Sequence, residues 1–414
     1  MTRRAVITGL GIVSPIGVGV EAFWRSALEG RSGIGRPTLF DASNLPPECQ
    51  IVGEVRDFNP RDWMSAPAAK MAGRFSQFAV AAAKMALDDS GLDIEAIPKE
   101  RVRSAIGTSL QGQTDVAELN QKAFHRGDSI LPWTCLEYPA HAATSHISIA
   151  MGAQGHSTTF SSACAAGLDA IAWAANEIRS DRATVIVAGG TESPLSPFIL
   201  SVFHAANVLS RWDGPPQAAS RPFDARRSGL VLAEGAAIIV VEDEEHAQTR
   251  GARIYARLLS SAAATESAHL RKVDDTGAAT ATVLRQALSG AKLRPDDIDY
   301  ICAHGNSMPD YDTAETRAIK QAFGSYAWNL PISSQKSMCG QALAASSAMQ
   351  VVTTCLALKN GMIPPTINYR HPDPSCDLDY VPNRCRPARI RNAVIHAHSL
   401  GGLHIAAVLG TVDN

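Results

Sequence analysis

The sequence predicts an α/β fold in which one arrangement of strands and helices occurs twice. Short apolar runs alternate with helical patterns along the chain, which indicates helices layered over a parallel or mixed sheet. A strand, a turn of small polar residues and a long helix also follow one another in both halves. With 414 residues, 45% of them hydrophobic and 19% charged, the chain has ample material for a large core.

Buried strands and one long helix account for most of the first half. Alanine-rich periodicity predicts the helix over residues 71–87, and Ser90 and Gly91 are expected to end it. The strands are predicted at residues 5–13, 102–107, 184–190 and 230–241, the last as two segments around Glu234 and Gly235.

The second half repeats this pattern. Strands are predicted at 254–259, at 298–303 and within 393–408, and a helix over about 342–358. The segment TTFSSA before Cys164, with the helix AAGLDAIAWAANEI after it, matches PISSQKSMCG followed by QALAASSAMQVVTTCLAL. We place the boundary at the charged segment EDEEHAQTRGAR, which gives units of 1–250 and 251–414. Loops of both units are then expected at the carboxyl ends of strands, where α/β proteins build sites.

Composition argues against several classes of function. The formal net charge of −2 gives no electrostatic reason to expect nucleic acid or a membrane surface as partner, and no apolar run reaches the length of a membrane span. The eight cysteines include no CxxC pair, so we expect reduced thiols in a cytoplasmic protein and no metal site. The apolar run after the basic start is broken by Gly9 and Gly11, which favours a buried strand over a signal peptide.

Cys164 is the candidate nucleophile. It lies between a predicted strand and a predicted helix, within the small-residue segment SSACAAG at 161–167. A thiol in the first helical turn is close to the positive end of the helix dipole and to unpaired N–H groups, and both favour the reactive thiolate. The alternative is a buried structural cysteine, which is more common for an arbitrary cysteine. The small neighbours at a helix start favour the nucleophile here.

Four further candidates lie in the second unit. His304 ends a strand just before a glycine-containing loop, although a lone histidine is more often structural. Lys336 could supply a fixed cation, and Glu315 could pair with it if the fold brings their loops together. The segment that contains Gly401 and Gly402 either presents N–H groups to an oxyanion or forms only a hairpin turn.

Several long segments are typical of one enzyme family. They are VITGLGIVSPIGVGVEAFW at the start, the turn at Cys164, VIVAGGTES at 185–193, and QAASRPFDARRSGLVLAEGAA at 217–237 with EHAQTRGARIYA after it. The chain resembles, over its whole length, the β-ketoacyl-acyl-carrier-protein synthases of the elongating type, including polyketide ketosynthases. The resemblance implies a duplicated thiolase-like fold with five layers, αβαβα, and a dimer.

The resemblance also implies roles for the candidate residues. Cys164 would take an acyl group from the phosphopantetheine arm of an acyl carrier protein, so no cofactor would be bound to the chain itself. A malonyl thioester would then lose carbon dioxide, and its enolate would attack the acyl-cysteine. His304 would be the first active-site histidine, Lys336 the family lysine and Glu315 the acidic residue that holds it. The N–H groups of Cys164 and His398 would form the oxyanion hole.

The sequence departs from the family pattern at the site. Gln341 replaces a second histidine; its amide can donate a hydrogen bond, as the asparagine of related Cys-His-Asn synthases does, but it cannot act as a base. We therefore expect altered or weaker decarboxylation. Asn306 and Met308 replace two threonines that bind the pantetheine arm, and His398 stands where a gating phenylalanine is usual. The helix at 65–70, usually basic for carrier docking, has lost most of its positive charge.

These observations leave three readings of the function. The first is a ketosynthase, of secondary metabolism rather than primary fatty-acid synthesis. The second is a non-catalytic partner like the chain-length-factor subunits, against which the presence of Cys164 argues. The third is an acyltransferase that loads Cys164 without decarboxylative condensation. All three imply a homodimer or a heterodimer with a homologous subunit.

Overall fold

The computed structural model, which describes residues 3–110 and 116–412, contains two sets of five strands with the same connectivity. The first set has the order β6-β5-β7-β8-β1 and the second β11-β10-β14-β15-β9, so each runs third, second, fourth, fifth, first along the chain. In both sets the first three strands in this sheet order are parallel to one another, and the fourth strand is antiparallel to the neighbour on each side. This identity of order and direction confirms the predicted internal duplication. The first set comprises β1 (Ala5–Ser14), β5 (Val102–Gly107), β6 (Ser157–Phe160), β7 (Val185–Glu192) and β8 (Gly235–Asp243). The second comprises β9 (Ala256–Thr265), β10 (Tyr300–Cys302), β11 (Ile332–Ser333), β14 (Asn392–His398) and β15 (Leu403–Gly410).

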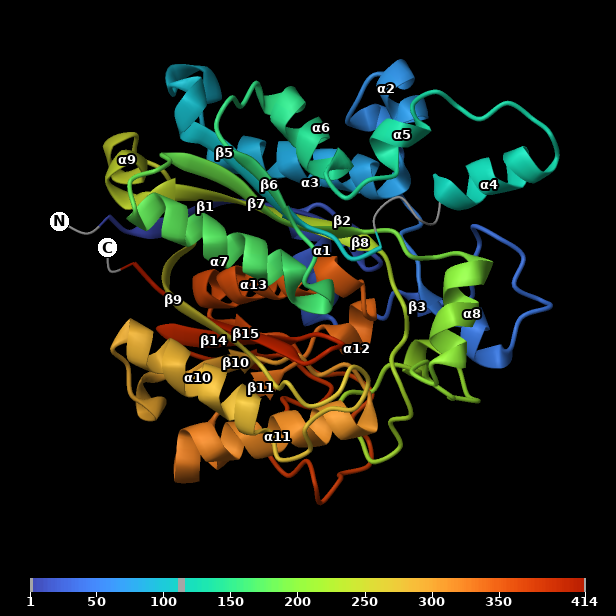
Figure 1. Cartoon of the computed structure of the whole chain (residues 1–414). Coiled ribbons are helices and arrows are strands. Elements are labelled where there is room, and N and C mark those ends of the chain that lie inside the picture. The colour runs from blue at the N-terminus through green and yellow to red at the C-terminus, as the bar shows by residue number, and fades with distance from the viewer. Residues whose placement is uncertain (1–2, 111–115, 413–414) are drawn as a thin grey trace.

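The helices and the two sets of strands form five layers (Figure 1). Helices α3 (Arg74–Ser90) and α6 (Ala142–Met151) cover the outer face of the first set, and α10 (Ala278–Ala291) and α11 (Pro309–Phe323) that of the second. Between the sets lie α7 (Ala166–Arg179) and α13 (Leu343–Asn360). The predicted αβαβα thiolase-like architecture is therefore confirmed.

Helix α13 is buried on all sides. Every residue from 343 to 358 is buried, and only the last two are not. Its sequence has no polar face because both sets of strands pack against it, and small residues allow that close approach. Helices α7 and α13 approach closely at Gly167, where an added Cβ atom would lie 2.5 Å from the carbonyl oxygen of Ala344. The start of α7, next to Cys164, is thereby held against the start of α13.

The remaining elements connect or flank the layers. The connecting and flanking elements are α1 (Val20–Leu28), α2 (Ala66–Met71), α4 (Ala117–His125), α5 (Thr134–Glu137), α8 (Pro197–Ala205), α9 (Glu244–Thr249), α12 (Lys336–Cys339), β2 (Gly17–Val18), β3 (Ile34–Gly35), β4 (Val52–Gly53), β12 (Met362–Ile363) and β13 (Arg386–Pro387). Residue 250, the expected boundary of the two units, lies between α9 and β9. No helix in the described ranges combines the length and the apolar character that crossing a bilayer requires.

One predicted strand differs from the structure. Residues 230–234 do not form a strand of the main sheet; they are extended and make isolated bridges, one of them between Leu232 and Gln341. The apolar stretch 393–408 is a hairpin of two strands, one of the two alternatives for the glycine segment, and Gly401 and Gly402 have φ angles of 94° and 82° that permit its tight turn. Both segments position the candidate site.

Candidate active site

Cys164 lies in a strained turn that is held by the second unit. The residue belongs to a 3₁₀ turn, Ala163–Ala165, between β6 and α7, and Ala163 has a φ angle of 50°. The N–H of Ala165 donates to Ser399 Oγ at 3.0 Å, and that hydroxyl donates to the carbonyl of Ser162 at 2.6 Å. The hairpin between β14 and β15 therefore fixes the backbone on both sides of the thiol.

The Cys164 thiol is buried, and its protonation differs from the expectation. Burial raises the pKa of Cys164 above the usual value for a thiol. The Gln341 amide, the Lys336 ammonium and the Leu400 N–H oppose this rise in the pKa, but they do not reverse it. The helix terminus was expected to favour the thiolate, whereas burial of the sulfur shifts the pKa of Cys164 in the opposite direction.

His304 supplies a buried N–H donor. Its Nδ1 accepts a hydrogen bond of 3.2 Å from the N–H of His398, so the neutral ring carries its proton on Nε2. Burial, the charge of Lys336 and the neighbouring histidines lower the pKa of His304 well below its usual value. The Nε2 atom is buried and has no hydrogen-bond partner in the described chain. An unsatisfied buried donor of this kind is suited to a substrate oxygen.

Lys336 fixes the loop of His304 without forming the expected ion pair with Glu315. Its Nζ donates to the carbonyl of His304 at 2.6 Å and to Oε1 of Gln350 at 3.3 Å. The Glu315 carboxylate instead accepts N–H groups of His304 and Gly305, each at 2.8 Å, and contacts His396 Nδ1 at 2.6 Å. The pairing of Glu315 with Lys336 was wrong because backbone donors already surround the carboxylate, which acts on the lysine only through its charge.

Gln341 presents an unsatisfied amide to the site. Its backbone is fixed, since its N–H donates to the carbonyl of Val231 at 2.7 Å and its own carbonyl accepts from Ala233 at 2.9 Å. Both polar atoms of the side chain are buried without a hydrogen bond of ordinary geometry in the described residues. The amide nevertheless lies close enough to lower the pKa of Cys164. The residue thus offers both a donor and an acceptor beside the thiol.

The oxyanion hole predicted from the N–H groups of Cys164 and His398 is corrected at one position. The N–H of His398 is already bonded to His304, whereas the N–H of Leu400 faces the Cys164 sulfur and lowers its pKa. Gly401 and Gly402 form the hairpin turn, and the N–H of Gly402 donates to the carbonyl of Ser399 at 3.1 Å. The two glycines therefore shape the turn that positions Leu400, and the N–H group that faces the sulfur is that of Leu400 and not of a glycine.

Asn306 and Met308 lie on the loop after His304. The side-chain oxygen of Asn306 accepts the N–H of Met308 at 3.0 Å, and the N–H of Asn306 donates to Asp312 at 3.0 Å. Met308 packs against an apolar cluster that includes Cys164. The other members that line this cluster are Phe40, Leu45, Cys49, Val52, Leu110, Leu195, Ile199, Leu200, Phe203, Ala206, Val208, Leu209, Leu230, Leu232 and Leu343. The thiol therefore adjoins an apolar packed cluster.

Sequence reasoning missed two buried polar residues that hold the site together. Gln350 on α13 donates to the carbonyls of Cys302, Ala303 and His396 at 3.0, 2.8 and 2.9 Å. Glu192, at the end of β7, accepts the N–H groups of Ser109 and Leu110 at 2.7 and 2.9 Å. The available signal for Gln350 was a large polar side chain in a helix otherwise made of small and apolar residues.

Comparison with known proteins agrees with this arrangement. Residues 2–247 match the sequence model of the β-ketoacyl synthase N-terminal domain, and residues 255–370 that of the C-terminal domain. The chain is 38% identical to 3-oxoacyl-[acyl-carrier-protein] synthase 2 of Coxiella burnetii, with 99% of each chain covered. It is 37% identical to the tetracenomycin polyketide synthase ketoacyl synthase alpha subunit of Streptomyces glaucescens, over 98% of this chain and 97% of the other.

Solved structures show the same architecture. A type II polyketide ketosynthase in complex with its acyl-carrier protein (AntDE:AntF) superposes with a TM-score of 0.92 at 35% identity, and all of both chains is covered. The ishigamide ketosynthase/chain length factor gives a TM-score of 0.92 at 32% identity, again over the whole of both chains. The protein therefore belongs to the β-ketoacyl synthase family, as its sequence resemblance predicted.

Proposed function

We propose that this protein is a β-ketoacyl-acyl-carrier-protein synthase that loads an acyl group on Cys164 and condenses it with a malonyl-type extender. The observation that carries the proposal is the buried Cys164 thiol beside the unsatisfied Gln341 amide. A second unsatisfied donor, His304 Nε2, belongs to a ring that bonds to the hairpin that also fixes the turn of Cys164. The relatives named 3-oxoacyl-[acyl-carrier-protein] synthase 2 and tetracenomycin polyketide synthase ketoacyl synthase alpha subunit support the proposal. The departures at Gln341, Asn306 and Met308 favour a role in secondary metabolism. The eight free cysteines fit a reducing, cytoplasmic setting.

In the first half-reaction, the Cys164 sulfur attacks the carbonyl carbon of the carrier-bound acyl thioester. The developing oxyanion accepts a hydrogen bond from the N–H of Leu400. The carbon–sulfur bond to the pantetheine arm breaks, and the thiol proton of Cys164 leaves with the pantetheine sulfur. The products are an acyl-cysteine thioester and a carrier protein with a free thiol.

In the second half-reaction, the carbon–carbon bond of a malonyl thioester breaks to release carbon dioxide and leave an enolate. The enolate oxygen accepts hydrogen bonds from His304 Nε2–H and the Gln341 Nε2–H₂ group. The enolate carbon then attacks the acyl-cysteine carbonyl, and the Cys164 sulfur leaves and recovers a proton from solvent. Lys336 orients His304 through its carbonyl and keeps the ring neutral, so it is a positioning residue.

Acyl loading is the first test of this function. Intact-protein mass after incubation with acyl-carrier-protein thioesters should show an acyl adduct that Cys164→Ala lacks, and malonyl-carrier protein should discharge it as a β-keto product. An adduct that is never elongated would instead support the acyltransferase reading. Absence of any adduct on the correctly folded wild type would contradict the ketosynthase proposal and support a non-catalytic partner subunit.

Gln341 should determine the rate of decarboxylation. We expect Gln341→Leu to lower carbon dioxide release from malonyl-carrier protein by about 100-fold, the usual loss for one oxyanion donor, and Gln341→His to raise it. The release is measured in a Cys164→Ala background, where loading cannot interfere. Gln77→Leu removes a partly buried amide that bonds to Ala69 and Ala72, and it serves as the control that should leave the release unchanged. Equal rates for all three variants would rule out a role for the amide.

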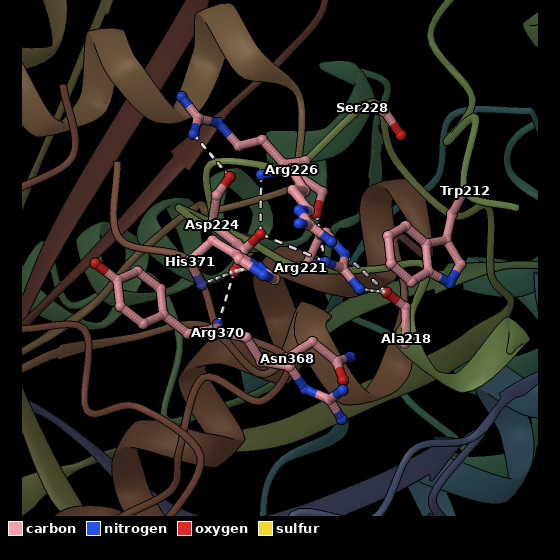
Figure 2. A network of polar contacts seen from close by, with 12 residues as sticks. Trp212, Ala218, Arg221, Asp224, Arg226, Ser228, Asn368, Arg370 and His371 are labelled. Carbon is pink, nitrogen blue, oxygen red and sulfur yellow. Dashed lines mark hydrogen bonds and ion pairs between the residues drawn. The ribbon is translucent and has the colours of Figure 1, made fainter. Parts of the chain in front are cut away.

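A basic surface near the loop of Asn306 is the proposed docking site for the carrier protein. The N–H of Arg221 donates to Ser307 Oγ at 2.5 Å, which attaches the segment 217–229 to this loop. Figure 2 shows how buried Asp224 accepts the N–H groups of Arg226, Arg370 and His371 at 2.9, 2.7 and 2.7 Å. These bonds leave the side chains of Arg226 and Arg370 exposed.

The position of this surface explains how docking can persist although α2 carries only Lys70. The acidic carrier protein and the phosphate of its pantetheine arm would meet the guanidinium groups of Arg226 and Arg370 at the rim of the site.

Charge reversal tests this docking surface. The double variant Arg226→Glu, Arg370→Glu should lower the second-order rate of Cys164 acylation from the carrier-bound thioester by at least about tenfold. The rate from a small N-acetylcysteamine thioester should fall far less. Arg285→Glu, exposed on α10, is the matched control. A similar loss with both donors would show that the arginines do not recognise the carrier.

Dimerisation is proposed along β6. This strand ends the sheet order of the first set, so one of its edges is unpaired in the described chain. Ile149, on the neighbouring α6, is 79% exposed. The named ketosynthase/chain-length-factor relative supports pairing with a second subunit.

Light scattering of the purified chain should give the mass of two chains, and Ile149→Glu should shift it toward one. Trp328→Glu, which changes a 50% exposed side chain in the second unit, should leave the mass unchanged. A single-chain mass for the wild type would contradict self-association and leave only a heterodimer to be tested by co-expression.

A further inference from the structure

Three side chains of the second unit bring metal-ligand atoms together beside the active site. They are Oε1 of Glu266, Nε2 of His398 and Nε2 of His404, which all lie within 4.8 Å of one another. We propose that these residues form a binding site for a divalent transition metal of the zinc type. This inference goes beyond the condensation chemistry and is independent of whether Cys164 accepts an acyl group.

Sheet register explains why the three side chains meet. Strands β14, β15 and β9 are neighbours, and His398 pairs directly with His404 across the first two. His404 pairs in turn with Ala264 on β9, and Glu266 follows two residues later, toward the same face. Directly paired side chains of an antiparallel sheet lie about 5 Å apart, so the positions converge by construction of the sheet.

The distances suit tetrahedral coordination. Oε1 of Glu266 lies 2.9 Å from Nε2 of His404 and 3.6 Å from Nε2 of His398. Nitrogen and oxygen ligands at zinc–ligand distances of about 2.0–2.2 Å are about 3.3–3.6 Å apart in a tetrahedron. Small rotations of the Glu266 and His404 side chains would therefore bring these two distances into the range that the ion requires. Three protein ligands leave a fourth position for water or a substrate oxygen.

The surroundings orient the ligand atoms. Thr280 Oγ1 lies 2.8 Å from Nδ1 of His404, and the Nε2 of His396 lies 3.4 Å from the same Nδ1, so the contacts on that side leave Nε2 to face Glu266. The other carboxylate oxygen of Glu266 accepts the N–H of Asp274 at 2.9 Å, which leaves Oε1 for the ion. Second contacts of this kind are typical of metal ligands, because they fix the ring orientation and the carboxylate.

One ligand atom of the cluster is buried and unused. His398 is 4% exposed, and its Nε2 has no hydrogen-bond partner in the described residues. The Glu266 side chain beside it is 3% exposed. A cation between these groups would use the free nitrogen and offset the cost of burying the carboxylate.

The proposed site adjoins the catalytic groups. The His398 ring stacks on Tyr311 at 4.5 Å, and the backbone N–H of His398 donates to His304 Nδ1 and so orients that ring. A bound ion would tie β9 to the hairpin that carries Leu400, so it would hold the oxyanion donor in place.

Cobalt substitution tests the proposal on the full chain. After treatment with a chelator, the wild type should bind about one Co²⁺ per chain, seen by visible absorption, and metal analysis of untreated protein should show zinc-type ions. Glu266→Gln, His398→Phe and His404→Ala should each weaken binding by about 100-fold or more, and Thr280→Val by about tenfold. His246→Ala removes a histidine that contacts Glu242 on another part of the chain, at 2.6 Å, and should not change Co²⁺ affinity.

A second measurement needs only the wild type, because a ligand variant can fail to fold. Added Zn²⁺ should raise the melting temperature of the chelator-treated chain, since a ligand that binds the native state stabilises it, and the chelator should reverse the rise. Absence of both the Co²⁺ spectrum and the Zn²⁺-dependent shift would overturn the proposal and leave a cluster that shares a proton. Unchanged Co²⁺ affinity in folded Glu266→Gln and His398→Phe would overturn it as well.

Discussion

The active site depends on one buried amide at the centre of the molecule. Gln350 lies in the middle of α13, and its Nε2 donates to a carbonyl at the end of β10 and to one within β14, while its Oε1 accepts from Lys336. The central helix touches both sets of strands, so this side chain links the layer behind Cys164 to the strands that carry His304 and the hairpin of Leu400. An amide is the right group for this purpose, because it can satisfy donors and acceptors without introducing a charge into the core.

Burial sets the chemistry of the groups around this amide. The Cys164 thiol, the His304 ring and the Gln341 amide are all neutral at rest, since removal of water disfavours their charged forms or no charge is available. Lys336 therefore acts in a medium of low dielectric, where its field reaches both the thiol and the imidazole. The buried donors at His304 Nε2 and at the Gln341 amide are already in position for an oxygen that becomes negative. This is electrostatic preorganisation, obtained here from the exclusion of water.

Apolar periodicity and repeated strand–turn–helix patterns were enough to predict the α/β fold and its duplication, because they report on burial, and the family resemblance added the five layers. The sequence did not predict the partners within the site. Glu315 was expected beside Lys336, and the His398 N–H was expected free, but both bond to the backbone or ring of His304. Nothing in the sequence indicated that burial raises the pKa of Cys164. The position of the cysteine at a helix start can be predicted from spacing, whereas its burial depends on residues of the opposite unit. Leu400 was missed because an N–H group carries no side-chain signal.

The two units meet at the thiol, and this contact locates the departures from the family pattern. The first unit contributes the strained turn of Cys164. The second contributes His304 and the hairpin between β14 and β15, and the departures at Gln341, Met308 and His398 all belong to it. Ser399, also in the second unit, bonds the N–H of Ala165 and the carbonyl of Ser162, so the geometry of the turn depends on the hairpin of the opposite unit. A change in that hairpin therefore acts on the turn of Cys164 as well as on the donors of the second unit.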